Sequence, residues 1–349
     1  MMLERMSFDD DNQAKEWDAF VEAHPKGTPY HMSGWLRAIE ETYSFKPAAH
    51  VWRNQGAITS VFPAFWVKSL LSGSRLISLP FSDYGGPLFS DESMAQEALQ
   101  QLLQKYKGKT KFIEIRGNVP DGSGLVSLNY YKSHILDLQH DLSELRKKID
   151  KRTIQYSIRK AEKAGLEIRE VNDEQGIGEF YKLNILTRKK HGVPSQPSKF
   201  FKNLLKHVIL KGHGYLLLAY DKSQVVAGSL FLTSGKRMHY KYNASDPNVL
   251  GKITPNHALT FHAIKKGCEE GYRSLDFGRT SPDNEGLMRY KAMWGCAVLD
   301  APYYYYPEIK GTSSLQEDSK LYKTLTGVWR KLPTPIIEII GPWVYRYMA

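Results

Sequence analysis

Residues 275–295 read LDFGRTSPDNEGLMRYKAMWG, and this segment is the most informative part of the chain. Residues 273–276 are predicted to form a strand that ends at Asp276, and Gly278 then permits a sharp turn or a close approach of backbone to a ligand. Arg279 carries a planar fork of donors that suits a carboxylate or a phosphate. Because open α/β sheets bind ligands at the carboxyl ends of strands, we expect a binding loop here.

The elements around this segment repeat. Hydrophobic periodicity and turn signals predict the order helix, helix, hairpin, strand, helix, strand in each half of the chain, offset by about 165 residues. An internal duplication explains this order, so the expected fold class is α/β with mixed sheets in two tandem domains. The predicted elements of the second half are helices 176–190 and 197–211, strands 215–220, 225–233 and 237–243, helix 255–270 and strand 273–276.

The first half shows the same order with its own turn signal at residues 54–56. Its predicted elements are helices around 17–21 and over 31–42, strands 48–53, 57–67 and 75–79, helix 93–107, and strands 111–116 and 130–138. At 349 residues the chain exceeds the usual size of one hydrophobic core. We therefore expect a first lobe over 1–140, a basic interlobe helix over 141–165, a second lobe over 166–310 and an amphipathic tail over 311–349.

The segment between the lobes combines a basic and an apolar face. Its basic ridge either is a solvated helix face or contacts an anionic substrate, for which Arg159 is the candidate. The basic and polar set is Lys148, Arg152, Gln155, Arg159 and Lys163, and the apolar set is Ile154, Ile158 and Ala161.

The tail interleaves aromatic and aliphatic residues with Arg330, Lys331 and Arg346. Three prolines interrupt residues 327–349, and no apolar run in the chain approaches the roughly 20 residues that span a bilayer. Aromatic side chains beside basic groups suit a lipid headgroup interface. Packing of the apolar side onto the protein itself is the alternative.

The net charge and the cysteine content indicate what kind of partner the protein binds and in which cellular compartment it resides. The net charge of +11 implies an anionic partner such as a pyrophosphate-bearing substrate, a nucleotide, nucleic acid or an acidic lipid surface, unless it serves only solubility. Two isolated cysteines, Cys268 and Cys296, argue against a disulfide framework and a zinc site, so no metal is predicted. Residues 1–11 show no secretory pattern, and we expect a cytoplasmic protein, with peripheral contact to the inner membrane face as an option.

Four motifs of the sequence form a recognisable combination: DFG to RYKAMWG over 276–295, PFSDYGGP over 80–87, SIRKAEKAG over 157–165 and RKKHGVP over 188–194. Together they resemble the FemAB peptidoglycan-bridge aminoacyltransferases and their BioF2-like acetyltransferase relatives in the GNAT superfamily. The tail motif WRKLP, residues 329–333, resembles a subgroup that accompanies exopolysaccharide and PEP-CTERM sorting systems.

The resemblance implies two tandem GNAT-like domains and transfer of an acyl or aminoacyl group onto an amine. The acceptor would be an anionic cell-envelope precursor, either a peptidoglycan muropeptide or an exopolysaccharide aminosugar. The donor would be acyl-CoA or aminoacyl-tRNA, so tRNA is a partner to consider and DNA is not. The long coiled-coil arm of well-known family members is not visible in this sequence.

The place that matches the CoA-binding turn of GNAT enzymes is residues 248–253, at the start of a predicted helix. Gly251 and Lys252 in this turn, together with Asn256 at the helix start, are therefore the candidate cofactor-binding residues. Asn256 could instead only cap the helix.

Amine attack on an activated carbonyl needs a neutral amine and a stabilised carbonyl oxygen. Lys291 matches the aromatic-lysine position of the family and is the candidate for electrostatic stabilisation, the alternative being an ordinary surface lysine. Asp83 could accept the amine proton, or only stabilise a turn. The candidate substrate-binding residues are Arg279, Arg289, Tyr290, Asp276, Tyr84, His191 and Arg159.

A second class of function is also compatible with this sequence. A non-catalytic binding module could use the basic segment over 141–165 to hold anionic lipid or RNA. Binding of that kind would weaken steeply with salt.

Overall fold

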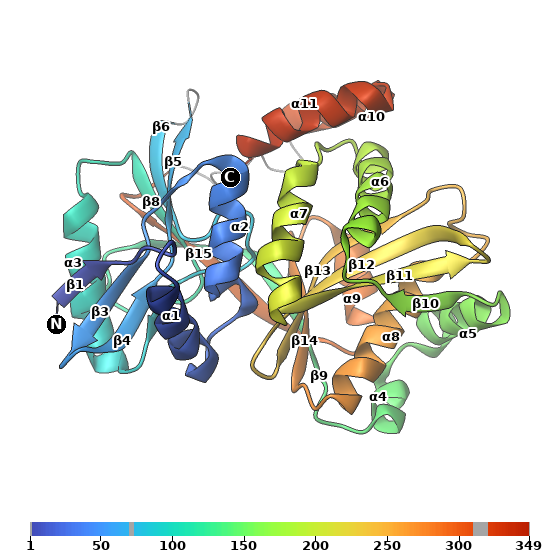
Figure 1. Ribbon diagram of the computed structural model, residues 1–349, viewed down its shortest axis with the longest axis horizontal. Coiled ribbons are helices and arrows are strands. Elements are labelled where there is room, and N and C mark those ends of the chain that lie inside the picture. The colour runs from blue at the N-terminus through green and yellow to red at the C-terminus, as the bar shows by residue number, and fades with distance from the viewer. Residues whose placement is uncertain (1, 70–72, 310–319, 349) are drawn as a thin grey trace. The chain divides into compact units, whose positions relative to one another are not determined.

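The computed structural model describes residues 2–69, 73–309 and 320–348, which form two compact units (Figure 1). Unit 1 comprises Met1–Tyr131 and Asp300–Ser314, and unit 2 comprises Lys132–Leu299 and Leu315–Met348. Both units combine helices with mixed or antiparallel sheets, which confirms the predicted α/β class. The domain boundaries expected from the sequence, at 140, 165 and 310, stay a prediction.

Unit 1 contains two groups of strands. One sheet has the order β1-β3-β4-β7, and the other strands follow the order β15-β8-β6-β5-β2, with β6 and β8 parallel. The elements are β1 Met2–Arg5, α1 Asp11–Ala23, α2 Ser33–Tyr43, β2 Lys46–Pro47, β3 His50–Asn54, β4 Ala57–Phe62, β5 Phe65–Ser69, β6 Gly73–Ile77, β7 Leu88–Phe89, α3 Ala95–Tyr106, β8 Phe112–Arg116 and β15 Ala297–Tyr306. Of β15, the residues from Asp300 onward belong to this unit.

The single strand expected over 57–67 is in fact two strands. β4 ends at Phe62 and pairs with β3 and β7, whereas β5 begins at Phe65 and pairs with β2 and β6. Pro63 lies between them, and proline cannot donate to a strand ladder. The chain therefore changes sheets at this residue.

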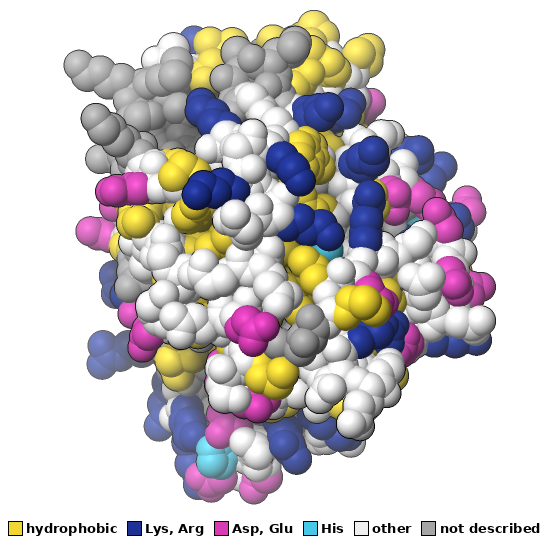
Figure 2. Space-filling view, turned by 90° about the vertical axis from the view of Figure 1, so that its left-hand side faces the viewer, with side chains coloured by type: hydrophobic (Ala, Val, Ile, Leu, Met, Phe, Trp, Pro, Cys, Tyr) yellow, Lys and Arg dark blue, Asp and Glu magenta, His cyan; other side chains and the backbone are white. Residues whose placement is uncertain are grey.

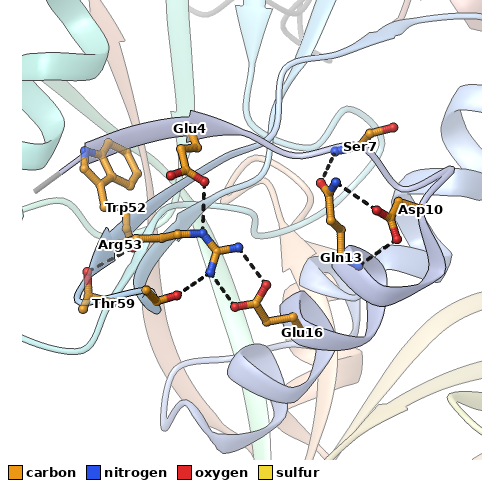
Figure 3. Close-up of polar contacts among 9 residues, drawn as sticks. Glu4, Ser7, Asp10, Gln13, Glu16, Trp52, Arg53 and Thr59 are labelled. Atoms are coloured by element: carbon orange, nitrogen blue, oxygen red, sulfur yellow. Dashed lines mark hydrogen bonds and ion pairs between the residues drawn. The ribbon is translucent and has the colours of Figure 1, made fainter.

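Arg53 ties three parts of unit 1 together (Figure 3). Its guanidinium donates from Nε to Glu4 Oε2 at 3.0 Å, from NH2 to Glu16 Oε2 at 2.7 Å and from NH1 to the carbonyl oxygen of Gly56 at 2.8 Å. These bonds connect β1, α1 and the β3–β4 turn. The hydrogen bond from Arg53 lowers the pKa of Glu16 below its ordinary value of 4.5.

Unit 2 is built on a sheet of order β10-β11-β12-β13-β14-β9, in which β13 and β14 are parallel and the other paired neighbours antiparallel. Of β9, the residues from Lys132 onward belong to this unit. The strands are β9 Val126–Asp137, β10 Glu167–Glu170, β11 Gly214–Asp221, β12 Gln224–Ser234, β13 Arg237–Ser245 and β14 Ser274–Thr280, and the helices are α4 Leu142–Lys148, α5 Tyr156–Lys163, α6 Glu174–His191, α7 Ser198–His207, α8 Pro255–Glu269, α9 Glu285–Ala292, α10 Lys320–Lys331 and α11 Thr334–Arg346.

Both faces of this sheet are covered by helices. Leu217 and Ala219 of β11 pack in the same core as Leu259 and Ile264 of α8. The alternate face of β12 meets α6, where a Cβ added to Gly228 would lie 2.8 Å from the ring of Phe180. Strands covered on both faces are apolar throughout rather than alternating, which explains the continuous hydrophobic runs over 214–234.

The basic segment over 141–165 is interrupted rather than one helix. α4 ends at Lys148, a π-helical turn spans Lys151–Gln155, and α5 follows from Tyr156. Asp150 accepts a hydrogen bond from the backbone N–H of Thr153 at 2.6 Å and restarts the helix. The two predicted faces are confirmed, since the apolar set Ile154, Ile158 and Ala161 is buried and Lys148, Arg152, Arg159 and Lys163 are exposed.

Two further differences concern the segment at 275–295. β14 continues to Thr280 instead of ending at Asp276, and the expected loop contains the helix α9. Asn284 caps this helix by accepting from the backbone N–H of Leu287 at 3.2 Å. The polar residues that indicated a loop therefore include a helix start.

In the described part of the chain the longest helix is α6, with 18 residues. None of the helices described combines the length and the apolar character that crossing a bilayer requires.

We expect Arg53→Ala to lower the free energy of unfolding by about 1–2 kcal/mol at pH 7, the range for charge-assisted hydrogen bonds after solvent screening. The contribution from Glu16 is present above pH 4.5 and is lost as pH falls through the lowered pKa of its carboxyl in the folded protein. Urea denaturation at pH 7 and near pH 3 measures both effects. Arg169→Ala, which breaks an exposed pair with Glu167, is the control and should have no measurable effect.

Candidate functional site

The parallel strands β13 and β14 of unit 2 separate soon after they pair. Their register covers only Arg237 with Ser274, Met238 with Leu275 and His239 with Asp276, although both strands continue for several residues. Two parallel strands that diverge present their carboxyl ends side by side, which is where α/β sheets bind ligands. The region beyond His239 and Asp276 is therefore the candidate site.

Asp276 organises the point of separation. Its buried carboxylate accepts hydrogen bonds at Oδ1 from the backbone N–H of Gly278 at 2.7 Å and from Ser133 Oγ at 3.3 Å. Its Oδ2 lies 3.8 Å from Nδ1 of His239. Gly278 has φ of 74°, a conformation that favours glycine. Asp276 thus positions a backbone turn at Gly278 within β14, where the register with β9 shifts, and substrate contact by this residue stays a prediction.

Lys291 is buried against the same turn. Only 6% of the residue is exposed, and its Nζ donates to the carbonyl oxygens of Gly278 at 2.8 Å and Arg279 at 3.3 Å. The alternative of an ordinary surface lysine is therefore wrong. An ammonium in this position supplies a preorganised positive charge at the end of β14.

His134 is a residue of this site that the sequence did not reveal. Its side chain is completely buried on β9, and neither ring nitrogen has a hydrogen-bond partner among the described residues. Burial first, and then the charge of Lys291, lowers the pKa of His134 to about 4, so its imidazole is neutral at pH 7. The available signal was the polar pair Ser133-His134 inside an otherwise strand-forming run.

The charges of Asp276 and Lys291 also affect the pKa of Cys296. Burial and the nearby Asp276 raise the pKa of the Cys296 thiol to about 12, and the opposite effect of Lys291 does not offset them. The thiol is therefore protonated at neutral pH and a poor nucleophile.

An aromatic wall borders the site. The ring centroid of Tyr290 lies 5.6 Å from that of His257 and 6.3 Å from that of Trp294, and Phe277 lies 5.8 Å from Tyr240. Burial raises the pKa of the Tyr290 hydroxyl. Tyr290 and Trp294 thus pack against each other in an aromatic cluster, and substrate binding by Tyr290 stays a prediction.

A polar network connects β12, β13 and the start of α8. Asn243 Nδ2 donates to Ser229 Oγ at 3.0 Å and to Asn256 Oδ1 at 3.3 Å, and the hydroxyls of Ser229 and Tyr240 lie 3.2 Å apart. Asn256 is thereby held at the N-terminal end of a 15-residue helix. Such an end carries partial positive charge and favours anions.

The other expected cofactor residues lie in the loop before α8. Gly251 has φ of 90°, and its carbonyl oxygen accepts from Lys160 Nζ at 2.7 Å. Lys252 is exposed, and its backbone N–H donates to the carbonyl oxygen of Val249. Asn256, Gly251 and Lys252 are thus neighbours in one loop-helix segment of unit 2.

The remaining candidates are more dispersed. Arg279 is half-buried on β14, and Arg289 is exposed on α9, two residues before Lys291. Arg159 is exposed on α5. His191 is exposed at the end of α6, where partial burial of its ring and the charges of Arg188, Lys190 and Arg330 lower its pKa.

Asp83 and Tyr84 belong to unit 1. Asp83 Oδ2 accepts from the hydroxyl of Tyr30 at 2.8 Å, and Trp35 Nε1 donates to Ser82 Oγ at 2.8 Å. Phe81 has φ of 63°, which is strained for an aromatic residue and marks a loop held by its surroundings. Within unit 2 the structure brings together Asp276, Arg279 and Lys291, and separately groups the loop before α8.

The raised pKa of the Cys296 thiol predicts slow chemical labelling of this residue. In a Cys268→Ser background, Cys296 should react with Ellman's reagent at pH 8 at least about 100-fold more slowly in the folded protein than in urea, because its thiolate is scarce. Absorbance at the released thionitrobenzoate band follows the reaction. Equal rates in both states would contradict the placement of Cys296 beside Asp276.

His134 should titrate abnormally. Its folded-state pKa of about 4 is below the ordinary 6.5, so the unfolded chain takes up a proton first and stability falls as pH drops from 6.5 toward 4. We expect His134→Asn to reduce this loss. Urea denaturation of both proteins at pH 7 and pH 5 measures it, and an NMR titration that gives His134 a pKa near 6.5 would contradict its burial.

Comparison with known proteins adds to this geometry. Residues 149–292 match the family model of the acetyltransferase (GNAT) domain. Among curated proteins, the lipid II:glycine glycyltransferase of Staphylococcus epidermidis is 31% identical over 99 residues, which cover 24% of each chain. The corresponding Staphylococcus aureus protein is 33% identical over 76 residues, covering 20% of this chain and 18% of the relative. The chain thus spans about a quarter or less of the length of the curated relatives it matches.

Solved structures share the fold over most of the chain. The crystal structure of FemX has a TM-score of 0.66 at 17% identity and covers 87% of this chain and 97% of its own. A tandem GNAT protein from the clavulanic acid pathway has a TM-score of 0.53 at 11% identity and covers 87% of this chain and 97% of its own. Residues 149–292 therefore match a GNAT acetyltransferase domain, and the chain shares its fold with FemX and with a tandem GNAT protein.

Proposed function

We propose that this protein transfers an acyl or aminoacyl group from an activated donor onto an amine of a cell-envelope precursor. The observation that carries the proposal is the buried ammonium of Lys291, held by two carbonyl oxygens at the end of β14 beside the separating strands. The relatives' names, which join lipid II to glycine, favour an aminoacyl donor and a muropeptide acceptor over an exopolysaccharide aminosugar.

The proposed transfer proceeds by nucleophilic attack of the acceptor amine on the donor carbonyl, followed by loss of the donor's leaving group. The acceptor nitrogen attacks the donor carbonyl carbon and forms the new C–N bond, while the carbonyl oxygen gains negative charge. Collapse of that intermediate breaks the bond to the donor's sulfur or ester oxygen, which leaves with the proton that the nitrogen gives up. Positive charge held in place for the oxyanion is worth more in a buried site than in water.

The residues of unit 2 supply these roles in the following way. Lys291 stabilises the developing oxyanion, and Asp276 positions the turn that holds Lys291. Neutral His134, whose ring nitrogens have no partner among the described residues, can accept a hydrogen bond from the attacking amine. Arg279 and Arg289 are the candidate ligands for the diphosphate or carboxylates of an anionic acceptor.

The donor binds, in this proposal, at the loop-helix segment of Gly251, Lys252 and Asn256. The N-terminal end of α8 favours the phosphates that acyl-CoA and aminoacyl-tRNA share. Asp83 and Tyr84 of unit 1 are proposed to contact the acceptor. Arg159 and His191 are proposed as further contacts to negative charge.

One observation supports the second candidate function, a binding module without catalysis. The exposed face of Lys148, Arg152, Arg159 and Lys163 could hold an anionic polymer with no chemistry. Steep loss of RNA binding with salt and no transfer to any acceptor would favour this candidate.

Lys291→Met should lower the transfer rate by about 100-fold or more, the usual cost of removing one oxyanion-stabilising donor. The assay combines glycyl-tRNA or acetyl-CoA with a lipid II analogue or glucosamine and detects the product by mass spectrometry. The control Lys222→Met changes an exposed lysine in the β11–β12 turn and should keep full activity. The proposal fails if no acceptor gains mass with either donor, or if the folded Lys291→Met protein is as active as the wild type.

A further inference from the structure

The last two helices of unit 2 present apolar side chains to solvent. On α11, Ile339 is 79% exposed and Trp343 is 64% exposed, and Ile336 precedes them on the same face. Positions 336, 339 and 343 are separated by three and four residues, so they form one continuous stripe along the helix. On α10, Leu325 and Val328 are more than half exposed at the same spacing. We call these five residues the apolar stripe.

The opposite face of α11 is anchored to unit 2. Ile337 is completely buried, and a Cβ added to Gly341 would lie 3.0 Å from Ser195 Oγ. Gln196 Nε2 donates to the hydroxyl of Tyr345 at 3.1 Å. One face of α11 therefore packs on unit 2. The part of the apolar stripe on α11 lies on the other face of this helix and is exposed to solvent.

The helix α10 brings this stripe close to a basic turn. A Cβ added to Gly192, at the C-terminal end of α6, would lie 2.4 Å from the carbonyl oxygen of Thr326, so the two segments touch. Lys189 Nζ also donates to Thr334 Oγ1 at 3.3 Å, and Arg330 to the carbonyl oxygen of His191 at 3.5 Å. The last turn of α6 carries Arg188, Lys189 and Lys190.

The charge around the stripe is mostly positive. Residues 324–348, all within the described part of the chain, contain Arg330, Lys331 and Arg346 but only one acidic residue, Glu338. With the three basic residues of α6 this makes six cations beside the apolar stripe. Figure 2 shows apolar side chains gathered along the upper edge of the view, the edge at which α10 and α11 lie in Figure 1.

We propose that the apolar stripe and its six basic neighbours form a docking surface for an anionic lipid bilayer. Tryptophan and isoleucine side chains suit the headgroup and acyl boundary, while lysine and arginine bind the acidic headgroups. With 12 and 13 residues, α10 and α11 are too short to cross a bilayer and would lie along its surface. Pairing of two copies through the stripe would instead bring like-charged clusters together.

This inference does not depend on the proposed acyl transfer, because it rests on the tail and α6 alone. Its test measures binding without turnover. The purified full-length chain is sedimented with vesicles of phosphatidylcholine alone and with vesicles that contain phosphatidylglycerol, at low and high salt. We expect binding to the anionic vesicles at low salt, weaker binding at high salt, and little binding to the neutral vesicles.

Two variants locate the surface, each with a matched control. Ile339→Glu combined with Trp343→Glu should weaken binding to anionic vesicles by at least about tenfold, because two inserted side chains become charged. Leu210→Glu, at an apolar residue equally exposed on the 3₁₀ turn before β11, should bind like the wild type. Arg330→Glu with Lys331→Glu should also weaken binding, whereas Lys222→Glu should not.

Thermal denaturation monitored by circular dichroism confirms that each variant is folded; all of the changed side chains are exposed. The proposal is overturned if the wild type does not sediment with anionic vesicles, or if the double glutamate variant binds as well as the wild type. It is equally overturned if the wild type forms a dimer that the double variant loses, with no vesicle binding, since the occupant would then be a second copy.

Discussion

The buried ammonium of Lys291 is the constraint on which the proposed site depends. Removing a charged amine from water is costly unless polar groups replace the lost hydration. Here the carbonyl oxygens of Gly278 and Arg279 do so, and they can point at one atom because Gly278 adopts a left-handed conformation. Asp276 accepts from the backbone of that same glycine, so one carboxylate and one ammonium hold the turn from opposite sides.

The separation of β13 from β14 places the charge of Lys291 at the candidate binding site. Parallel pairing stops at His239 and Asp276, directly before the turn that Lys291 holds. The aromatic wall of Tyr290 and Trp294 and the polar network around Asn256 lie on the elements next to this point. The charge, the apolar surface and the helix end are therefore brought together by the strand geometry, and the neutral imidazole of His134 lies on β9 near the same charge.

Local patterns predicted much of the fold. The periodic apolar residues predicted the helices α2, α6, α7 and α8, and the turn signals predicted the hairpin of β11 and β12. Both kinds of signal depend on neighbours within a few residues along the chain. The errors have local causes as well. Pro63 divided an expected strand, and Asn284 started a helix where polar residues had indicated a loop.

The sequence alone predicted the α/β class and the tandem arrangement, and its motifs made Lys291 a candidate for electrostatic stabilisation, since composition, periodicity and motif are properties of the chain itself. Only the tertiary structure decided that Lys291 is buried, that His134 lies beside its charge, and that the stripe of Ile339 and Trp343 faces solvent. These facts depend on which residues from distant segments pack around a side chain. Helical spacing shows that two faces of α11 are apolar, but packing against Ser195 and Gln196 determines which one is covered.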